Sequence, residues 1–171
     1  MKNYIHNEKG SLSIWFIIIV FVFLGIAVLV MDFGSLYMNN KTVKESLNRA
    51  VKAAALAINE NEHLAEGIFT IDPARAEVNF KQILAENIGL NEVTLDPLPT
   101  GSLVTEKPEI KEFVVENSTP TTYFSPALKN SFIFEHPSVL AVVRIKVKGV
   151  FSSRTFTLYK LSSSQLTSVY E

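Results

Sequence analysis

Residues 60–66 hold the densest group of side chains that could bind a metal. The group contains carboxylates and one imidazole, from Glu60, Glu62, His63 and Glu66. Both kinds of side chain are ligands of divalent metals. Alternating acids after a helix are more typical of a solvated turn, however, and neither His6 nor His136 adds a ligand at a metal-binding spacing. We therefore expect no metal site in this chain.

The sequence offers even less support for covalent catalysis than for a metal site. Serine is abundant, but the sequence has no Gly-x-Ser-x-Gly nucleophile motif and no Gly-rich phosphate loop before a helix. It has no Cys, which excludes thiolate nucleophiles, thiolate metal sites and disulfides. The sequence thus predicts no catalytic residue and no cofactor, and we expect a protein that is not an enzyme.

A basic stripe is the remaining candidate for recognition. Arg144, Lys146 and Lys148 occupy alternate positions of a segment with strand periodicity, and alternate residues of a strand share one face. The stripe could bind an acidic partner or a wall polymer, or it could be only the solvated side of a sheet. Nucleic acid is not expected as a partner, because the formal net charge is −1 and neither half of the chain is strongly basic.

The element that comes before all these residues is an apolar run. Residues 10–31 carry no charge, and at about 1.5 Å per residue the stretch 11–31 spans about 30 Å, the thickness of a hydrocarbon core. A backbone in lipid must satisfy its own polar groups, so the run should be an α-helix. A secretory signal would have a shorter apolar core and a small-x-small site, whereas Val30, Met31 and Asp32 close this run. We therefore expect a retained transmembrane helix over residues 11–31.

The charges that flank the run bear on its orientation. Lys2 and Lys9 precede it, and four cations follow it within about 20 residues, so their count alone leaves the orientation open. Long exported segments translocate largely regardless of charge, and no cation lies between Met31 and Lys41. We expect residues 1–10 to be a cytoplasmic leader and the C-terminal part to be extracellular.

Residues 32–58 are predicted to continue the helix as a stem. Apolar side chains recur at three- and four-residue steps without a proline, at Leu36, Val43, Leu47, Ala50, Ala54 and Ile58. This stripe could pack on the chain's own exported domain, or it could serve helix–helix assembly. The candidate assembly contacts are Asp32, Gly34, Tyr37, Leu47 and Ala54. Asp32 could pair with a neighbouring subunit or sit among lipid headgroups.

Residues 59–171 are predicted to form an exported α+β domain with one helix packed on a mostly antiparallel sheet. Asp72 can cap the helix, Pro73 suits its first turn and Gly89 is placed to end it. Strands are expected at 110–116, 132–135, 141–148 and 155–161, loops at 95–108 and 117–122, and a poorly packed tail at 162–168. Val142 is expected on the solvated face of its strand with the basic stripe.

Three blocks of the sequence carry a family resemblance. They are Lys9-Gly10-Ser11-Leu12-Ser13, Asp32-Phe33-Gly34-Ser35-Leu36-Tyr37 and Ala53-Ala54-Ala55-Leu56-Ala57. In order and spacing they resemble TadE/TadG-like proteins of the Flp (tight adherence) pilus system, over about residues 9–57. The resemblance implies a bitopic protein with a cytoplasmic leader and an exported C-terminal domain, acting as a minor pilin or assembly component rather than a catalyst.

The same resemblance implies a processing site. Lys9-Gly10 looks like a prepilin peptidase site, at which cleavage after Gly10 would leave Ser11 as the first residue. Pilin-type substrates usually carry Glu at the fifth position after the cut, where this chain has Trp15. The difference favours an unprocessed or accessory role.

Two functional hypotheses of different classes follow. The first is a single-pass cell-membrane protein that serves as a structural or assembly component of a pilus or secretion-type apparatus. Its partners would be the lipid bilayer, other pilus or assembly proteins and other copies of itself, through the N-terminal helix. The alternative is a freestanding membrane-tethered adhesin or ligand-binding domain whose activity lies in residues 59–171.

Overall fold

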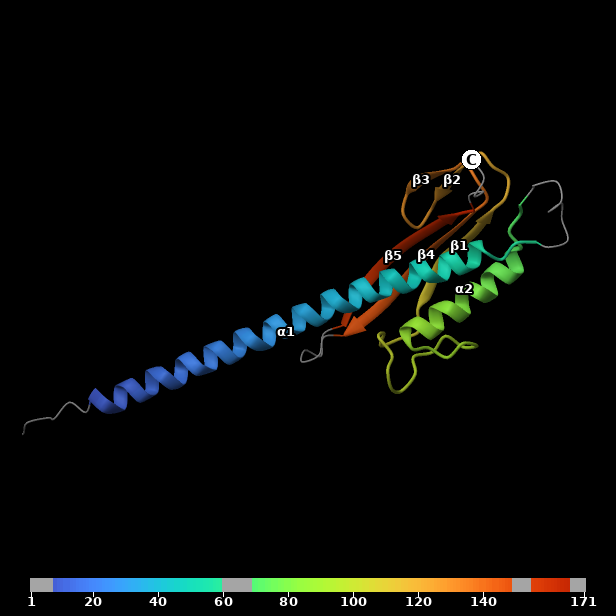
Figure 1. Ribbon diagram of the computed structural model, residues 1–171. Helices are drawn as coiled ribbons and strands as arrows, with labels where there is room; N and C mark the ends of the chain where they lie inside the picture. The colour runs from blue at the N-terminus through green and yellow to red at the C-terminus, as the bar shows by residue number, and fades with distance from the viewer. Residues whose placement is uncertain (1–7, 60–68, 149–154, 167–171) are drawn as a thin grey trace, which may run out of the picture.

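The fold combines one long helix with a small domain built against its C-terminal half (Figure 1). The computed structural model describes residues 8–59, 69–148 and 155–166, with side chains from residue 14 onward. These residues form the helices α1 (Glu8–Ala55) and α2 (Pro73–Ile88), followed by the strands β1 (Glu109–Glu116), β2 (Thr121–Ser125), β3 (Asn130–Phe134), β4 (Ser138–Lys148) and β5 (Thr155–Gln165). The α+β class predicted from the sequence is confirmed.

Helix α1 is 48 residues long, which at 1.5 Å per residue gives about 72 Å. It is unbroken because the segment contains no proline and because the Ala-rich end has high helix propensity. The helix ends at Ala55, so the prediction that it continues to Ile58 was wrong. Ile58 instead forms an antiparallel bridge with Ile71, because backbone hydrogen bonds between residues 57–59 and 70–72 replace the helical ones.

Helix α2 has the caps that the sequence predicts. Asp72 Oδ1 accepts hydrogen bonds from the backbone N–H groups of Ala74 at 2.9 Å and Arg75 at 3.2 Å. These bonds satisfy two of the donors that a helix start leaves without partners. Gly89 ends the helix in the left-handed conformation, with φ of 75°. The buried face of α2 consists of Ala76, Phe80, Leu84, Ala85 and Ile88.

The main sheet is antiparallel with the order β1-β4-β5. Strand β1 agrees with the prediction within one residue, but β5 continues to Gln165, where a poorly packed tail was predicted. That prediction was wrong because residues 162–165 pair with residues 138–141 of β4 in the same register as the rest of the strand. Strands β2 and β3 form a separate hairpin, and β2 begins inside the segment predicted as a loop.

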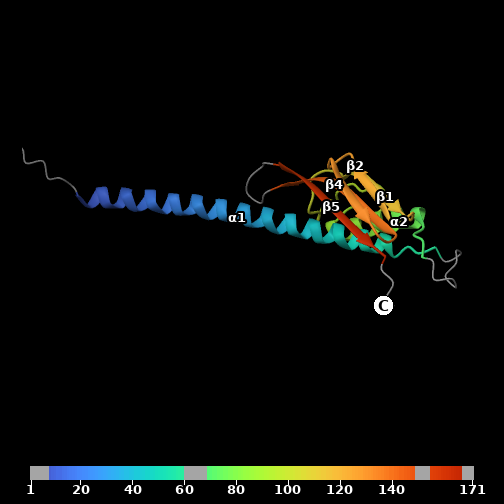
Figure 2. The same ribbon diagram turned by 90° about the horizontal axis from the view of Figure 1, so that it is seen from above.

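The sheet separates two cores. On one face, alternate residues of β4 from Val139 to Val147 pack with the buried faces of α1 and α2. On the other face, Leu140 and Val142 are buried with Phe134 beneath the β2–β3 hairpin. The prediction that Val142 is solvated was therefore wrong, because the hairpin covers that half of the second face. Figure 2 shows α1 on one side of the sheet and β2 on the other.

Candidate functional site

The first feature with functional meaning is the N-terminal half of α1. Every residue from Ile14 to Met31 is exposed, including Phe16 at 69% and Phe21 at 70% of their surface. Among the described residues, α1 is the one helix long and apolar enough to cross a membrane, by length and composition. None of the described residues of the domain covers this segment (Figure 1).

The C-terminal half of the same helix has the opposite environment. Val43, Leu47, Ala50, Val51 and Ala54 are at most 1% exposed and belong to the main core. Because the two halves form one continuous helix, the orientation of the apolar half is set by the packing of the domain core.

The residues predicted as assembly contacts fall into two groups. Leu47 and Ala54 lie in the chain's own core, where α1 meets α2 and the sheet. Gly34 and Tyr37 are exposed, and no atom lies within 4 Å of where a Cβ on Gly34 would be. Asp32 is only 8% exposed, so it is the first buried side chain along the described part of α1. The predicted processing residues 10 and 11 lie in the helical backbone of α1.

An apolar groove lies where the two halves of α1 meet. It has a volume of about 270 Å³ and is lined by Phe33, Leu36, Tyr37 and Asn40 of α1 and by Val147, Phe156 and Leu158 of the sheet. Asn40 Oδ1 is buried there, and it has no hydrogen-bond partner among the described residues. A buried acceptor without a partner is costly, so this oxygen calls for a donor from outside these residues.

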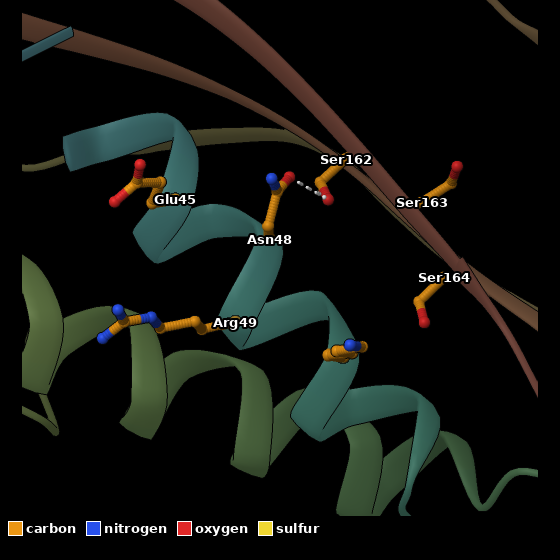
Figure 3. A pocket seen from close by; sticks show the side chains of 7 residues that line it. Glu45, Asn48, Arg49, Ser162, Ser163 and Ser164 are labelled. Carbon is orange, nitrogen blue, oxygen red and sulfur yellow. Dashed lines mark hydrogen bonds between the residues drawn. The ribbon is translucent and has the colours of Figure 1, made fainter. Parts of the chain in front are cut away.

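A polar groove of about 480 Å³ lies further along α1, between the helix and β5 (Figure 3). Its lining consists of Glu45, Asn48, Arg49, Lys52 and Ser162 to Ser164. Ser162 Oγ donates a 2.8 Å hydrogen bond to Asn48 Oδ1, which joins the two walls. Beside the groove, Lys44 Nζ donates a hydrogen bond to the backbone carbonyl oxygen of Leu161. This bond attaches the outer edge of β5 to the helix.

The lining of the polar groove carries one positive charge in excess, because Arg49 and Lys52 stand against Glu45. Burial lowers the pKa of Lys44, and the nearby positive charge of Lys160 lowers it further. Glu45 is the one acid in the lining, and Lys41 lies 3.8 Å from it. The hydroxyl of Ser162 donates to an amide oxygen, which is not a base and cannot activate it as a nucleophile. The arrangement can bind a polar or anionic group by hydrogen bonds and charge.

The basic stripe of β4 is locally neutralised. Arg144 Nη1 lies 3.0 Å from Glu109 Oε2, and Lys146 Nζ lies 2.7 Å from Glu106 Oε2. A hydrogen bond from Lys111 is the main cause of the lowered pKa of Glu109, to which Arg144 also contributes. Two of the three cations in the stripe, Arg144 and Lys146, therefore already have acidic partners within the chain.

The cluster predicted from Glu60, Glu62, His63 and Glu66 lies outside the described residues. Within the described part of the chain, no group of three or more His, Cys, Asp or Glu side chains is placed to hold a metal ion. Sequence reasoning missed both grooves. The polar positions Asn40 and Asn48 on the stem were a usable signal, but the opposite wall lies over 100 residues away and was assigned in part to a tail.

No family model matches this chain, and neither does a curated protein or a solved structure. The likeness to TadE/TadG-like proteins rests on the three sequence blocks within residues 9–57 alone. Function must therefore be inferred from the exposed half of α1 and from the two grooves beside its other half.

Proposed function

We propose that the protein is a single-pass membrane-anchored structural or assembly component of a pilus or secretion-type apparatus, and not a catalyst. The observation that carries the proposal is the division of α1 into an apolar, fully exposed half and a half that forms the domain core. Such a helix joins a lipid-soluble segment rigidly to a folded domain.

The energetics support insertion of the first half in lipid. Removing a large apolar side chain from water contributes about 1.5–3 kcal/mol. Nearly every residue from Ile14 to Met31 is of this kind and is exposed. Summed over the segment, its exposure to water would cost roughly tens of kcal/mol, more than the about 5–15 kcal/mol by which a domain is stable. We propose that residues 11–31 span the cell membrane, with residues 1–10 cytoplasmic and the domain extracellular.

The assembly role rests on the resemblance to TadE/TadG-like proteins. All three matching blocks lie on or directly after α1, so they are parts of one rigid element. The chain's own domain occupies the helix surface around Leu47 and Ala54. We therefore place the contacts with other subunits in the part of α1 before Val43, around Gly34, where the helix surface is open.

Disulfide crosslinking in native membranes tests this assignment. The chain has no cysteine, so single substitutions give unique sites. We expect Gly34→Cys to yield crosslinked dimers or adducts with other pilus proteins. Val78→Cys, at an exposed position of α2, is the matched control and should remain monomeric. Only monomer from Gly34→Cys and from a scan of residues 14–42 would contradict the assembly role.

Processing is a separate prediction. Trp15 stands where pilin-type substrates usually carry Glu, so we expect the protein to remain uncleaved after Gly10. Intact-mass measurement of protein extracted from its native membrane distinguishes the two products. A chain that begins at Ser11 would show that a peptidase accepts this leader.

The polar groove favours one alternative, a freestanding membrane-tethered adhesin or ligand-binding domain. Arg49, Lys52 and the hydroxyls of Ser163 and Ser164 offer hydrogen-bond donors to a ligand there. Exchanging residues 11–31 for an unrelated apolar helix separates the two functions. An assembly component should lose its function in the exchange, whereas a tethered binding domain should keep it.

A further inference from the structure

We propose that the paired strand residues Val147 of β4 and Phe156 of β5, nearest the apolar half of α1, lie at the lipid headgroup layer, and that lipid occupies the apolar groove there. This inference rests on the proposed membrane span and adds a lipid-binding surface to the domain itself. The groove is the one lined by Phe33, Tyr37 and Asn40 on α1 and by Val147 and Phe156 on the sheet.

Distances along α1 place this groove at the membrane surface. Phe33 and Tyr37 follow Met31 by two and six residues, so they lie about 3 and 9 Å beyond it along the helix. The headgroup layer on each side of a bilayer is roughly 5–7 Å thick. Phe33 therefore lies in this layer, and Tyr37 lies just outside it, when Met31 marks the edge of the hydrocarbon.

The sheet reaches the same level. Phe156 and Val147 pair with each other near the end of the β4–β5 hairpin and line the groove opposite Phe33 and Tyr37. Strand β5 runs beside α1 in both views, and its first residues lie toward the apolar half of the helix (Figures 1 and 2). If α1 crosses the membrane upright, this arrangement places the start of β5 at the membrane surface.

The side chains there suit that layer. Phe33 is 68% exposed, Tyr37 70% and Phe156 39%, which forms an aromatic surface continuous with the apolar helix. Amphipathic aromatic rings are favoured at the interface between lipid and water. Lys148, exposed at the end of β4, supplies a cation for lipid phosphates.

Asn40 places a hydrogen-bond acceptor in the lining of the otherwise apolar groove. Its Oδ1 is buried among apolar groups and has no partner among the described residues. Asn40 follows Met31 by nine residues, about 14 Å along the helix, so it lies outside the headgroup layer, and water held between the lipid and the domain is the donor for this acceptor. A purely apolar occupant, such as the side chains of a second α1 helix, leaves this oxygen without a partner.

Spin labels at three single cysteines test the proposal in the full chain. The sites are Val22→Cys in the apolar segment, Phe156→Cys in the groove, and Tyr159→Cys on the same strand as the control. Tyr159 is exposed on the face of β5 opposite the groove and lies three residues, or about 10 Å, further along the strand, away from the apolar half of α1. The protein is reconstituted in phosphatidylcholine and phosphatidylglycerol vesicles, and collision with oxygen is compared with collision with a water-soluble nickel complex.

We expect a lipid depth for residue 22, a headgroup depth for residue 156 and an aqueous environment for residue 159. An aqueous environment at both 156 and 159, with residue 22 in lipid, overturns the lipid surface and leaves the membrane span intact. An aqueous environment at residue 22 overturns the proposed span and the lipid surface with it. Strong spin–spin broadening at residue 156 identifies a second copy in the groove and overturns the assignment to lipid.

A spin label is itself apolar and can enter lipid without help from the protein. A second variant therefore tests whether the aromatic surface holds residue 156 in lipid. Phe33→Ser with Tyr37→Ser removes two exposed aromatic rings without touching the core. The ratio of oxygen to nickel collision at residue 156 should fall severalfold toward the value at residue 159. Val78→Ser on α2 is the matched control and should leave the ratio unchanged. An unchanged ratio in the double variant shows that the aromatic surface does not hold the hairpin in lipid.

Discussion

Gly89 is the residue with the tightest backbone constraint. Its φ is 75°, and a Cβ there would lie 2.6 Å from the carbonyl oxygen of Gly101. The left-handed conformation costs a non-glycine residue about 1–2 kcal/mol, and the contact with backbone adds to it. We expect Gly89→Ala to lower the free energy of unfolding by at least about 2 kcal/mol in denaturant titration of the detergent-solubilised protein.

Gly101→Ala is the matched control for this prediction. Gly101 has a similar φ of 82°, but no atom lies within 4 Å of where its Cβ would be. It should lose only the conformational cost of about 1–2 kcal/mol. Equal losses in the two variants would show that the helix end can move away from residues 101 and 102.

Lys44 makes stability depend on pH. Its pKa in the folded protein is lowered, mainly by burial and then by Lys160, below the ordinary value of 10.5 that the unfolded chain retains. Between these two pKa values the unfolded state binds more protons, so the free energy of unfolding rises with pH across that interval. Below the lowered pKa both states carry the charge, and the penalty of burying it is complete.

We therefore expect Lys44→Met to flatten the rise in stability toward alkaline pH, and Lys160→Met to reduce it in part. Unfolding midpoints measured over a pH series, each compared with the native sequence, isolate this contribution. Lys41→Met removes a lysine from an exposed position one turn earlier and should leave the alkaline slope as it is. A slope as steep in Lys44→Met as in the native sequence would contradict the assignment.

At the scale of the element, two leucines close to the C-terminal end of α1 differ in their burial. Leu47 is 1% exposed in the core, whereas Leu56, just past the helix, is 67% exposed. Truncating a buried leucine to alanine costs about 2–5 kcal/mol, because apolar contacts are lost and a cavity remains. Leu47→Ala should show this loss in thermal unfolding, and Leu56→Ala should stay within about 0.5 kcal/mol.

This comparison also separates the two roles predicted for the stem. If Leu47 contributes chiefly to the chain's own core, its truncation destabilises the isolated protein in detergent at every concentration. A loss that appears only in membranes with the partner proteins present would instead assign Leu47 to assembly.

At the scale of the whole molecule, the proposal predicts which side of the membrane each end occupies. External protease on intact cells should remove a tag placed after Glu171 and leave a tag placed before Met1 protected. The physical reason is that no described residue of the domain covers residues 14–31, so that in the proposed span lipid surrounds them and isolates the leader from the outside. Permeabilised cells should lose both tags. Survival of the C-terminal tag on intact cells, or recovery of the protein in the aqueous fraction, would contradict the topology.

Local chemistry determined much of this protein from the sequence. The apolar run, the absence of proline up to Pro73 and the Ala-rich stem were enough to predict a long helix. Asp72, Pro73 and Gly89 were enough to place α2, because helix caps depend on a few neighbouring residues. Strands with period-two alternation, such as β4, were likewise recognisable from their own residues.

Contacts between distant segments were decided only in the tertiary structure. Val142 is buried because the β2–β3 hairpin, which begins 21 residues earlier in the chain, folds across that face, and Ser162 belongs to a strand because β4 pairs with it. The two grooves have the same origin, since each needs one wall from α1 and one from β5. Periodicity reports which side of an element is apolar, whereas the segment that covers it depends on packing between residues far apart in the chain.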